Sequence, residues 1–415
     1  MNKGLLTLVD CHGLIYNSGM NENLDKLQPY PFQRLRDLFH GITPNQQLKP
    51  INLSIGEPKH ETPSLIKNAL VDHLSGLSTY PTTAGIPELR QTIAAWIARR
   101  YQIHAPDAEK AIIPVNGSRE ALFAFAQALI NPTCPQTPIV ICPNPFYQIY
   151  EGAAFLAGAE PYFLNTLPEN NHAMDFASVP ESIWLRTQLV YVCSPGNPSG
   201  KVMSLEQWKE LFTLSDQYGF TIAADECYSE IYFEEKLPPL GALQAARMLG
   251  RDFTRLVVFS SLSKRSNVPG MRSGFVAGDS KILEKFLIYR TYHGCAMSPA
   301  IQHASIAAWN DEAHVVENRR LYAEKFQRVL PMLQDVLNVQ RPDAAFYLWA
   351  RTPISDREYA IKLYRDLNIT VLPGSYLARD AHGTNPGKNF IRMALVAPLE
   401  ECIEAAKRIN NYVLD

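Results

Sequence analysis

The most informative stretch of the sequence is residues 256–277, which read LVVFSSLSKRSNVPGMRSGFVA. Two apolar runs, Leu256–Ser260 and Gly274–Ala277, enclose a serine-rich loop that carries Lys264 and Arg272. Neither run alternates with polar residues, which predicts strands buried on both faces of a sheet. A lysine directly after such a strand is unusual, because lysines normally lie on the surface. On its own Lys264 is typical of a solvated loop, so its neighbours decide its interpretation.

The middle of the chain repeats this arrangement of buried strands. Further strands are predicted at Ile139–Cys142, Leu189–Cys193 and Thr221–Ala224. Helices are predicted between the strands, at Ser118–Leu129, Tyr147–Ala157, Leu205–Tyr218 and Lys281–Tyr289. Strands that alternate with helices predict an α/β fold with a mostly parallel sheet.

A different pattern follows residue 300. A charged helical stretch is predicted over Ile301–Leu337 and a final helix from Leu399 onward. Shorter strands are predicted around Phe346–Trp349, Thr370–Leu372 and Asn389–Leu395. We therefore expect a large α/β domain over 63–300 and a smaller α+β domain over 301–415. An N-terminal arm over 1–62 would complete the small domain, with 1–19 as an extended start ahead of Met20.

The composition favours small molecules as partners. The 39 basic and 41 acidic side chains give a formal net charge of −2, so no basic field would attract nucleic acid. No apolar run reaches the roughly 18 residues that cross a membrane. The seven cysteines are scattered without a CxxC pair, which is typical of a reducing cytoplasm. His293, His303 and His314 lack the spacing of metal ligands, so no metal site is expected.

Two segments offer groups that bind phosphate. Ser261, Lys264 and Arg272 lie on one loop, and hydroxyl and guanidinium groups suit a phosphate monoester. Residues Gly117–Arg119 open a predicted helix, whose N-terminal amides and dipole also attract phosphate. Because such helix openings are often plain caps, this second signal depends on the first.

Polar residues also follow two other predicted strands. Asp225 comes directly after Thr221–Ala224 and precedes Tyr228, and Asn197 lies in a turn after Leu189–Cys193. Ligands of open α/β sheets bind at the carboxyl ends of the strands. A carboxylate there is commonly a helix cap, but it also suits a protonated pyridine nitrogen. Asn197 and Tyr228 can donate hydrogen bonds to a phenolic oxygen on the same ring.

An arginine lies in the middle of a predicted strand near the end of the chain. Arg392 interrupts the apolar run at 390–395, FIRMAL. An unpaired buried guanidinium is costly, so Arg392 needs an anionic partner, either a structural carboxylate or the carboxylate of a substrate. Tyr147 starts a predicted helix after a strand, and its ring can stack on a planar ligand or pack in the core.

Taken together, these motifs resemble the fold type I enzymes that use pyridoxal 5′-phosphate (PLP), and specifically the class I and II aminotransferases. The motifs are G-S-x-E-A-L at 117–122, S-P-x-N-P-S-G at 194–200, D-E-x-Y at 225–228, S-L-S-K at 261–264 and G-x-R-x-G at 270–274. Each motif is weak alone, but their order and spacing are specific. The resemblance implies an aspartate-aminotransferase-like fold in which the large domain over 63–300 binds PLP.

The resemblance also implies a role for each residue of these motifs. Lys264 would carry PLP as a Schiff base and move the reacting proton, and Asp225 would pair with the pyridinium nitrogen. Asn197 and Tyr228 would bind the ring oxygen, Tyr147 would stack on the ring, and Gly117, Ser118, Arg119, Ser261 and Arg272 would hold the phosphate. The substrate α-carboxylate would be bound by Arg392, Asn197 and the main chain at Gly56, and Tyr80 would reach the phosphate of the second subunit of a homodimer.

Longer strings are similar to bacterial N-succinyl-diaminopimelate aminotransferases of the lysine pathway. They include QPYPFQRLRDL at 28–38, IGEPKHETP at 55–63 and AADECYSEIYF at 223–233. The likeness implies a ping-pong reaction through pyridoxamine phosphate, with glutamate as amino donor and N-succinyl-2-amino-6-oxopimelate as the oxo acid. Aspartate or aromatic aminotransferases and PLP lyases remain alternatives. Arg34, or Arg290 with His293, are candidates for binding the distal carboxylate of the substrate.

Overall fold

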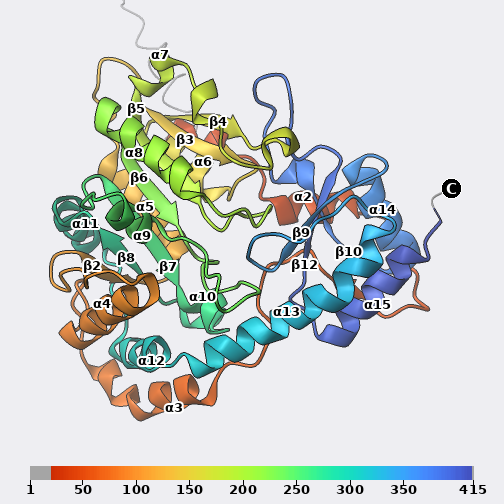
Figure 1. Ribbon diagram of the computed structural model, residues 1–415, viewed down its shortest axis with the longest axis horizontal. Helices are drawn as coiled ribbons and strands as arrows, with labels where there is room; N and C mark the ends of the chain where they lie inside the picture. The colour runs from red at the N-terminus through yellow and green to blue at the C-terminus, as the bar shows by residue number, and fades with distance from the viewer. Residues whose placement is uncertain (1–19, 414–415) are drawn as a thin grey trace, which may run out of the picture.

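Seven strands form the central sheet of the protein, which a computed structural model describes from residue 20 to residue 413 (Figure 1). The strands are β2 (Ile112–Val115), β3 (Ile139–Asn144), β4 (Glu160–Asn165), β5 (Thr187–Cys193), β6 (Thr221–Asp225), β7 (Leu256–Ser261) and β8 (Gly274–Gly278), in the spatial order β2-β8-β7-β6-β5-β3-β4. The strands from β7 to β4 are parallel, and β8 is antiparallel to both neighbours. The predicted mostly parallel α/β sheet is confirmed. The prediction about residues 1–19 lies outside the described residues.

The two edge strands of this sheet, β2 and β4, were not predicted from the sequence. Each contains a proline, Pro114 in β2 and Pro161 in β4. Proline cannot donate to the hydrogen-bond ladder and is therefore confined mainly to sheet edges, where it also weakens the sequence signal of a strand.

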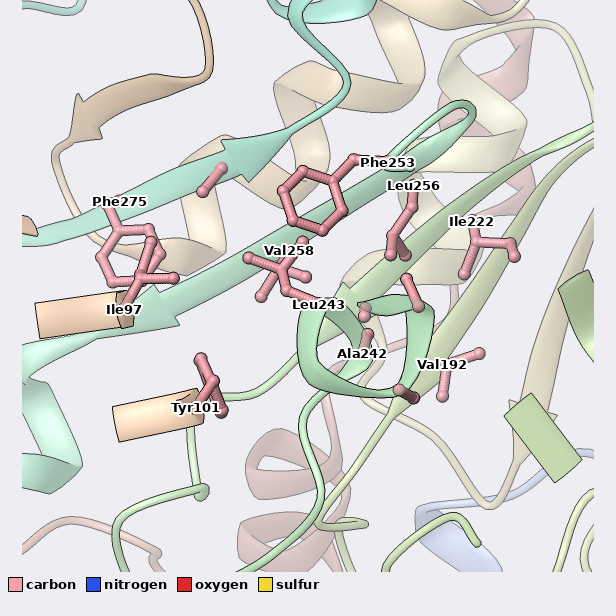
Figure 2. Close-up of a cluster of buried hydrophobic side chains, with 14 of the residues drawn as sticks. Ile97, Tyr101, Val192, Ile222, Ala242, Leu243, Phe253, Leu256, Val258 and Phe275 are labelled. Carbon is pink, nitrogen blue, oxygen red and sulfur yellow. The ribbon is translucent and has the colours of Figure 1, made fainter. Parts of the chain in front are cut away.

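Helices cover both faces of the sheet, because each strand directs alternate side chains to opposite sides. In β7, Leu256 and Val258 pack in one hydrophobic cluster (Figure 2). The helices on that face are α3 (Ser64–Asp72), α4 (Pro87–Tyr101), α7 (Glu181–Trp184), α8 (Leu205–Tyr218), α9 (Ala242–Met248) and α12 (Pro299–Asn310). Val257 and Phe259 pack in a second cluster with α5 (Ser118–Leu129), α6 (Ile149–Leu156) and α11 (Ser280–His293). Burial on both faces explains why these strands lack polar alternation.

Two smaller sheets form the second part of the protein. Strands β9 (Tyr347–Arg351), β11 (Leu372–Pro373) and β12 (Phe390–Ala394) pair antiparallel in the order β11-β12-β9. Strand β1 (Ile51–Asn52) pairs in parallel with β10 (Ile369–Thr370), so the N-terminal segment joins this part. The helices here are α2 (Pro31–Leu38), α13 (Ala313–Gln334), α14 (Asp356–Leu367) and α15 (Leu399–Asn410). In β12, Ile391 and Met393 pack against the cluster formed with α13, α14 and α15, which leaves Arg392 on the opposite face.

The predicted helical stretch Ile301–Leu337 is two helices, α12 and α13, with a break at Asp311 and Glu312. Helix α12 packs against α3 and α4, whereas α13 extends towards the smaller sheets and packs against α15 (Figure 1). We propose on this basis that the boundary between the two domains lies at this break rather than at residue 300. No helix within residues 20–413 has the length and apolar character needed to cross a membrane.

Candidate active site

The carboxyl ends of β5, β6 and β7 meet a cavity of about 860 Å³. The strand register places Cys193, Asp225 and Phe259 side by side at this edge. The predicted residues that line the cavity are Gly56, Ser118, Arg119, Tyr147, Asn197, Asp225, Tyr228, Ser261, Lys264, Arg272 and Arg392. We call the group Ser118, Asp225, Ser261, Lys264 and Arg272 the Lys264 wall. We call the group Asn197, Tyr228, Tyr347 and Arg392 the Arg392 wall.

Lys264 lies on the short helix α10 (Leu262–Arg265), which follows β7 directly. Ser261 begins this helix, and its Oγ accepts a hydrogen bond from the Ser263 amide at 3.1 Å. Burial lowers the pKa of the Lys264 amine, and the guanidinium groups of Arg272 and Arg119 lower it further. A lowered pKa increases the neutral fraction of the amine, which is the form that acts as a nucleophile and a base.

Asp225 is a buried carboxylate at the end of β6. It accepts hydrogen bonds from the Tyr150 hydroxyl at 2.7 Å and from the Cys227 amide at 3.2 Å. Burial raises the pKa of Asp225, and these hydrogen bonds oppose that shift. Within residues 20–413 no cationic side chain pairs with Asp225 at ion-pair distance. A cationic ligand beside it would offset the cost of burying the charge.

Gly117 lies beside Ser118 and Arg272 of the Lys264 wall. Gly117 precedes α5 with φ of +89°, and any side chain at this position would collide with the guanidinium of Arg272. The main chain at the α5 N-terminus and the guanidinium are therefore in direct contact. The Ser118 Oγ accepts a hydrogen bond from the Cys227 thiol at 2.9 Å, which leaves the Ser118 proton free to donate.

Arg392 is held by two oxygen acceptors that come from distant parts of the chain. Its Nη1 donates to Asn197 Oδ1 at 2.9 Å and its Nη2 donates to the Ser54 carbonyl at 2.7 Å. Its Nε is buried without a partner among the described residues. Since the Asn197 carbonyl oxygen is occupied, the Asn197 amide protons remain available to a ligand. Arg392 has no carboxylate partner within residues 20–413, as expected for a guanidinium that binds an anionic ligand.

The remaining part of the Arg392 wall is a pair of tyrosines. The hydroxyl groups of Tyr228 and Tyr347 are hydrogen-bonded at 2.9 Å, and the Arg392 guanidinium lies over the Tyr347 ring at 4.5 Å. A side chain at Gly56 would collide with the Tyr347 hydroxyl, so only glycine fits there. Burial raises the pKa of Tyr228, which therefore stays a protonated donor at neutral pH.

Three residues of the site were missed by sequence reasoning: Tyr150, Cys227 and Tyr347. Tyr150 lies on α6, three residues after Tyr147, which precedes the helix, and it donates to Asp225. This i, i+3 spacing was visible in the sequence, but nothing in the sequence showed which of the two rings contacts the carboxylate. Tyr347 is 119 residues away from its partner Tyr228, so no local pattern could pair them.

Arg119 and Tyr147, predicted to contact the phosphate and the ring, contact each other, whereas Tyr80 lies apart from the cavity. Arg119 is exposed, and its Nε donates to the Tyr147 hydroxyl, so the two side chains position each other. The Tyr147 ring lies edge-on to Tyr150 at 5.9 Å between centroids. Tyr80 does not line the cavity and is 99% exposed. Its role in a second subunit stays a prediction.

The candidates for binding the distal carboxylate of the substrate differ in their existing partners and in whether they line the cavity. Arg290 is fully buried and donates from Nη1 and Nη2 to Glu120 at 2.9 and 3.0 Å, so its charge is already paired. Arg34 on α2 lies over the Tyr376 ring at 4.0 Å and does not line the cavity. His293 does line the cavity.

The chain belongs to the aminotransferase class I and II family, which matches residues 49–409. Enzymes of this family use PLP, and the protein is accordingly a PLP-dependent transaminase acting on amino acids and oxo acids. An LL-diaminopimelate aminotransferase of Aquifex aeolicus is 31% identical over 95% of this chain and 99% of the relative.

Solved structures agree with this assignment. An aminotransferase from Neisseria meningitidis is 54% identical with a TM-score of 0.91, and the match covers 94% of this chain and 99% of that one. A probable N-succinyldiaminopimelate aminotransferase from Thermus thermophilus is 26% identical with a TM-score of 0.78, over 92% of this chain and 97% of that one.

The Lys264 wall fits PLP in its chemistry. The tight contact between Gly117 and Arg272 and the free proton of Ser118 suit a phosphate. The buried Asp225, which has no cationic partner within residues 20–413, suits a protonated ring nitrogen. When bound, PLP supplies an aldehyde that joins the lysine amine covalently and a ring that withdraws electrons from the reacting carbon.

Proposed function

We propose that the protein transfers the amino group of glutamate to N-succinyl-2-amino-6-oxopimelate, a step of diaminopimelate and lysine biosynthesis. The observation that carries the proposal is that Lys264 and Arg392 line the same 860 Å³ cavity. Ligand sites range over about 300–1,000 Å³, so this cavity has room for a cofactor together with a long tricarboxylate. The names of the Aquifex and Thermus proteins, both acting on diaminopimelate compounds, support this substrate class.

In this proposal the two walls divide the work. Arg392 clamps the α-carboxylate of the substrate through its two-pronged guanidinium, and the Gly56 main chain borders that position. The neutral Lys264 amine would accept the proton from the substrate Cα and donate it again later in the reaction. Asp225 keeps the ring nitrogen protonated, and Asn197 and Tyr228 donate to the ring oxygen.

The active unit in this proposal is a homodimer with shared sites. Tyr80 and its neighbours Leu74 and Leu77 are exposed by 99%, 47% and 69% in the single chain, which is the exposure expected of residues that a second copy covers. Tyr80 then reaches the phosphate site of the partner subunit.

A second candidate is direct transfer to or from LL-diaminopimelate, without the succinyl group. The Aquifex relative, 31% identical over nearly the whole chain, carries that activity in its name. The two candidates differ in the size and charge of the group at the far end of the substrate. A succinyl group brings an additional carboxylate, and this carboxylate needs a cationic partner such as Arg119, which lines the cavity together with His293.

The test is a visible spectrum of the purified holoenzyme, titrated first with glutamate and then with oxo acids. Glutamate should abolish the absorbance of the lysine-bound cofactor and release 2-oxoglutarate. We expect N-succinyl-2-amino-6-oxopimelate to restore the absorbance at a lower concentration than unsuccinylated, aspartate-derived or aromatic oxo acids. Restoration by the unsuccinylated compound alone would favour the second candidate, and ammonia release without 2-oxoglutarate would indicate a lyase.

A further inference from the structure

A chain of polar side chains leads from α13 to the main chain of Lys264. Asn318 Nδ2 donates to the Lys264 carbonyl at 3.3 Å and, more weakly, to the Arg265 carbonyl at 3.5 Å. His60 Nδ1 contacts Asn318 Oδ1 at 2.7 Å, and Lys325 Nζ contacts His60 Nε2 at 2.7 Å. Asn318 and Lys325 are each only 2% exposed, and neither they nor His60 line the active-site cavity. Substrate and cofactor binding therefore do not explain these groups.

The donors and acceptors among these side chains follow from the main-chain carbonyls at one end and Lys325 at the other. Main-chain carbonyls only accept, so Asn318 Nδ2 must be the donor and Asn318 Oδ1 the acceptor. Oδ1 then accepts from His60 Nδ1–H and from Asn267 Nδ2 at 3.1 Å. Lys325 is more basic than His60, because its pKa is about 8 whereas that of His60 lies below its ordinary value of 6.5, so protonated Lys325 Nζ donates and His60 Nε2 accepts. With Lys325 protonated, the state that satisfies every contact is a neutral His60 with its proton on Nδ1.

Protonation of His60 would break this arrangement. It would place an N–H donor and a positive charge against Lys325 Nζ, which lies at 2.7 Å and also donates. The other polar contact of Lys325 is the Val396 carbonyl at 3.3 Å, and within residues 20–413 no carboxylate pairs with it. Burial, and then the charge of Lys325, lower the pKa of His60, while burial lowers the pKa of Lys325 to about 8.

Several other charged groups lie near the His60 ring or near Lys325. Helix α13 contributes Glu317, which favours a protonated His60, and the Tyr322 ring, which lies 4.5 Å from the imidazole. The segment that carries His60 contributes the pairs Lys59–Glu57 and Lys67–Glu61, whose charges cancel. On the far side of Lys325, Cys402 of α15 raises the pKa of the amine. Lys325 therefore remains the dominant charge that faces the ring.

The hydrogen bonds among His60, Asn318 and Lys325 connect parts of the protein that hold both walls of the active site. His60 follows the Gly56 segment, Asn318 contacts the Lys264 main chain, and Val396 follows β12, which carries Arg392. We propose that His60, Asn318 and Lys325 are positioning residues, in which neutral His60 completes the chain that holds the Lys264 segment on α13 and protonated His60 releases it. This inference is independent of the substrate.

Nuclear magnetic resonance of the holoenzyme tests the first half of the proposal. The side-chain nitrogen shifts of His60 should show the Nδ1–H tautomer at pH 8. In Lys325→Met, which keeps the length of the side chain without its charge, the pKa of His60 should rise. An unchanged His60 titration in this variant, or the Nε2–H tautomer in the wild-type protein, would overturn the proposal.

Hydrogen exchange tests the second half, on residues 262–266 around Lys264. After correction for intrinsic rates, exchange in the wild-type holoenzyme should be about three- to tenfold faster at pH 5.5 than at pH 8, the effect of losing one hydrogen bond. In His60→Asn the amide Nδ2 can still donate to Asn318 Oδ1 but cannot titrate, so this difference should disappear. His40→Asn removes an exposed histidine on the N-terminal arm and should behave as the wild type. The proposal fails if His60→Asn retains the full wild-type pH response.

Discussion

The Lys264 wall and the Arg392 wall of the cavity are built in different ways. Asp225 and Lys264 each follow a buried strand of one sheet, and Arg272 precedes another strand of the same sheet. Ser54, Asn197 and Arg392 come from three separate segments, 338 residues apart at the extremes, and are held together by the guanidinium. The first wall is therefore fixed by one core, whereas the second depends on how the two parts of the protein are placed.

In the proposed function, this difference suits the Lys264 wall to the proton transfer and Arg392 to substrate recognition, while Asn197 and Tyr228 of the Arg392 wall also face the cofactor. Groups that act on a cofactor need fixed mutual geometry, which adjacent strand ends of a packed sheet provide. Groups that bind a substrate must admit it and release it, which suits a wall that joins two parts of the chain. Substitutions in the two walls should consequently produce different signatures, and the predictions below test that separation.

The largest effect is expected for Lys264→Ala. Without the amine, neither the covalent link to PLP nor the proton transfer at Cα is possible, and turnover should fall by about 10⁴-fold or more. The absorbance of the lysine-bound cofactor should also be lost. The fold should persist, because Ser261, not Lys264, caps α10. Steady-state rates, spectra and thermal unfolding, with the exposed Lys285→Ala on α11 as control, check the prediction. Residual activity within tenfold of the wild type would remove Lys264 from the mechanism.

A smaller and different effect is expected for Arg392→Ala. Loss of one partner of a buried, charge-assisted contact costs about 2–5 kcal/mol, so kcat/KM should fall by about 30-fold or more for both substrates. The lysine-bound cofactor should still form, because Lys264 lies on the other wall, although Asn197 loses its Arg392 partner. Arg392→Lys keeps the charge but loses the two-pronged geometry, so its kcat/KM should lie between those of the wild type and Arg392→Ala. Loss of the lysine-bound cofactor in Arg392→Ala would show that the walls are not separable.

The sequence predicted the Lys264 wall more completely than its surroundings. Asp225, Lys264 and Arg272 are each marked by an adjacent apolar strand, so a local pattern was enough to place them at one edge. The contacts that tune them are not local: Tyr150 bonds Asp225 across 75 residues and Tyr347 bonds Tyr228 across 119. A sequence read without its fold contains no signal for such pairs.

The break between α12 and α13 was missed for a related reason. The segment at 310–312, Asn-Asp-Glu, contains neither glycine nor proline, which are the strongest helix-breaking signals. Asp311 nevertheless ends the first helix, and its carboxylate accepts from the His314 amide at 3.0 Å, as a helix cap does. The aspartate was the available signal. What decides the break is the packing of the two helices on different cores.

The smallest effect, and the sharpest test of how the Lys264 wall is tuned, is expected for Tyr150→Phe. Its hydroxyl donates to Asp225 at 2.7 Å, and this bond favours the carboxylate and lowers its pKa against the opposing effect of burial. Without the bond the pKa of Asp225 rises, so Asp225 takes up a proton at a higher pH. The acid limb of the kcat profile should therefore move to higher pH, with a loss of about three- to tenfold in rate near that limb and little change at pH 8. Tyr191→Phe is the matched control, because the Tyr191 ring stacks on Tyr150 at 4.5 Å while its hydroxyl donates to the Leu122 carbonyl instead. An identical shift in both variants would mean that ring packing, and not the hydrogen bond, sets the protonation of Asp225.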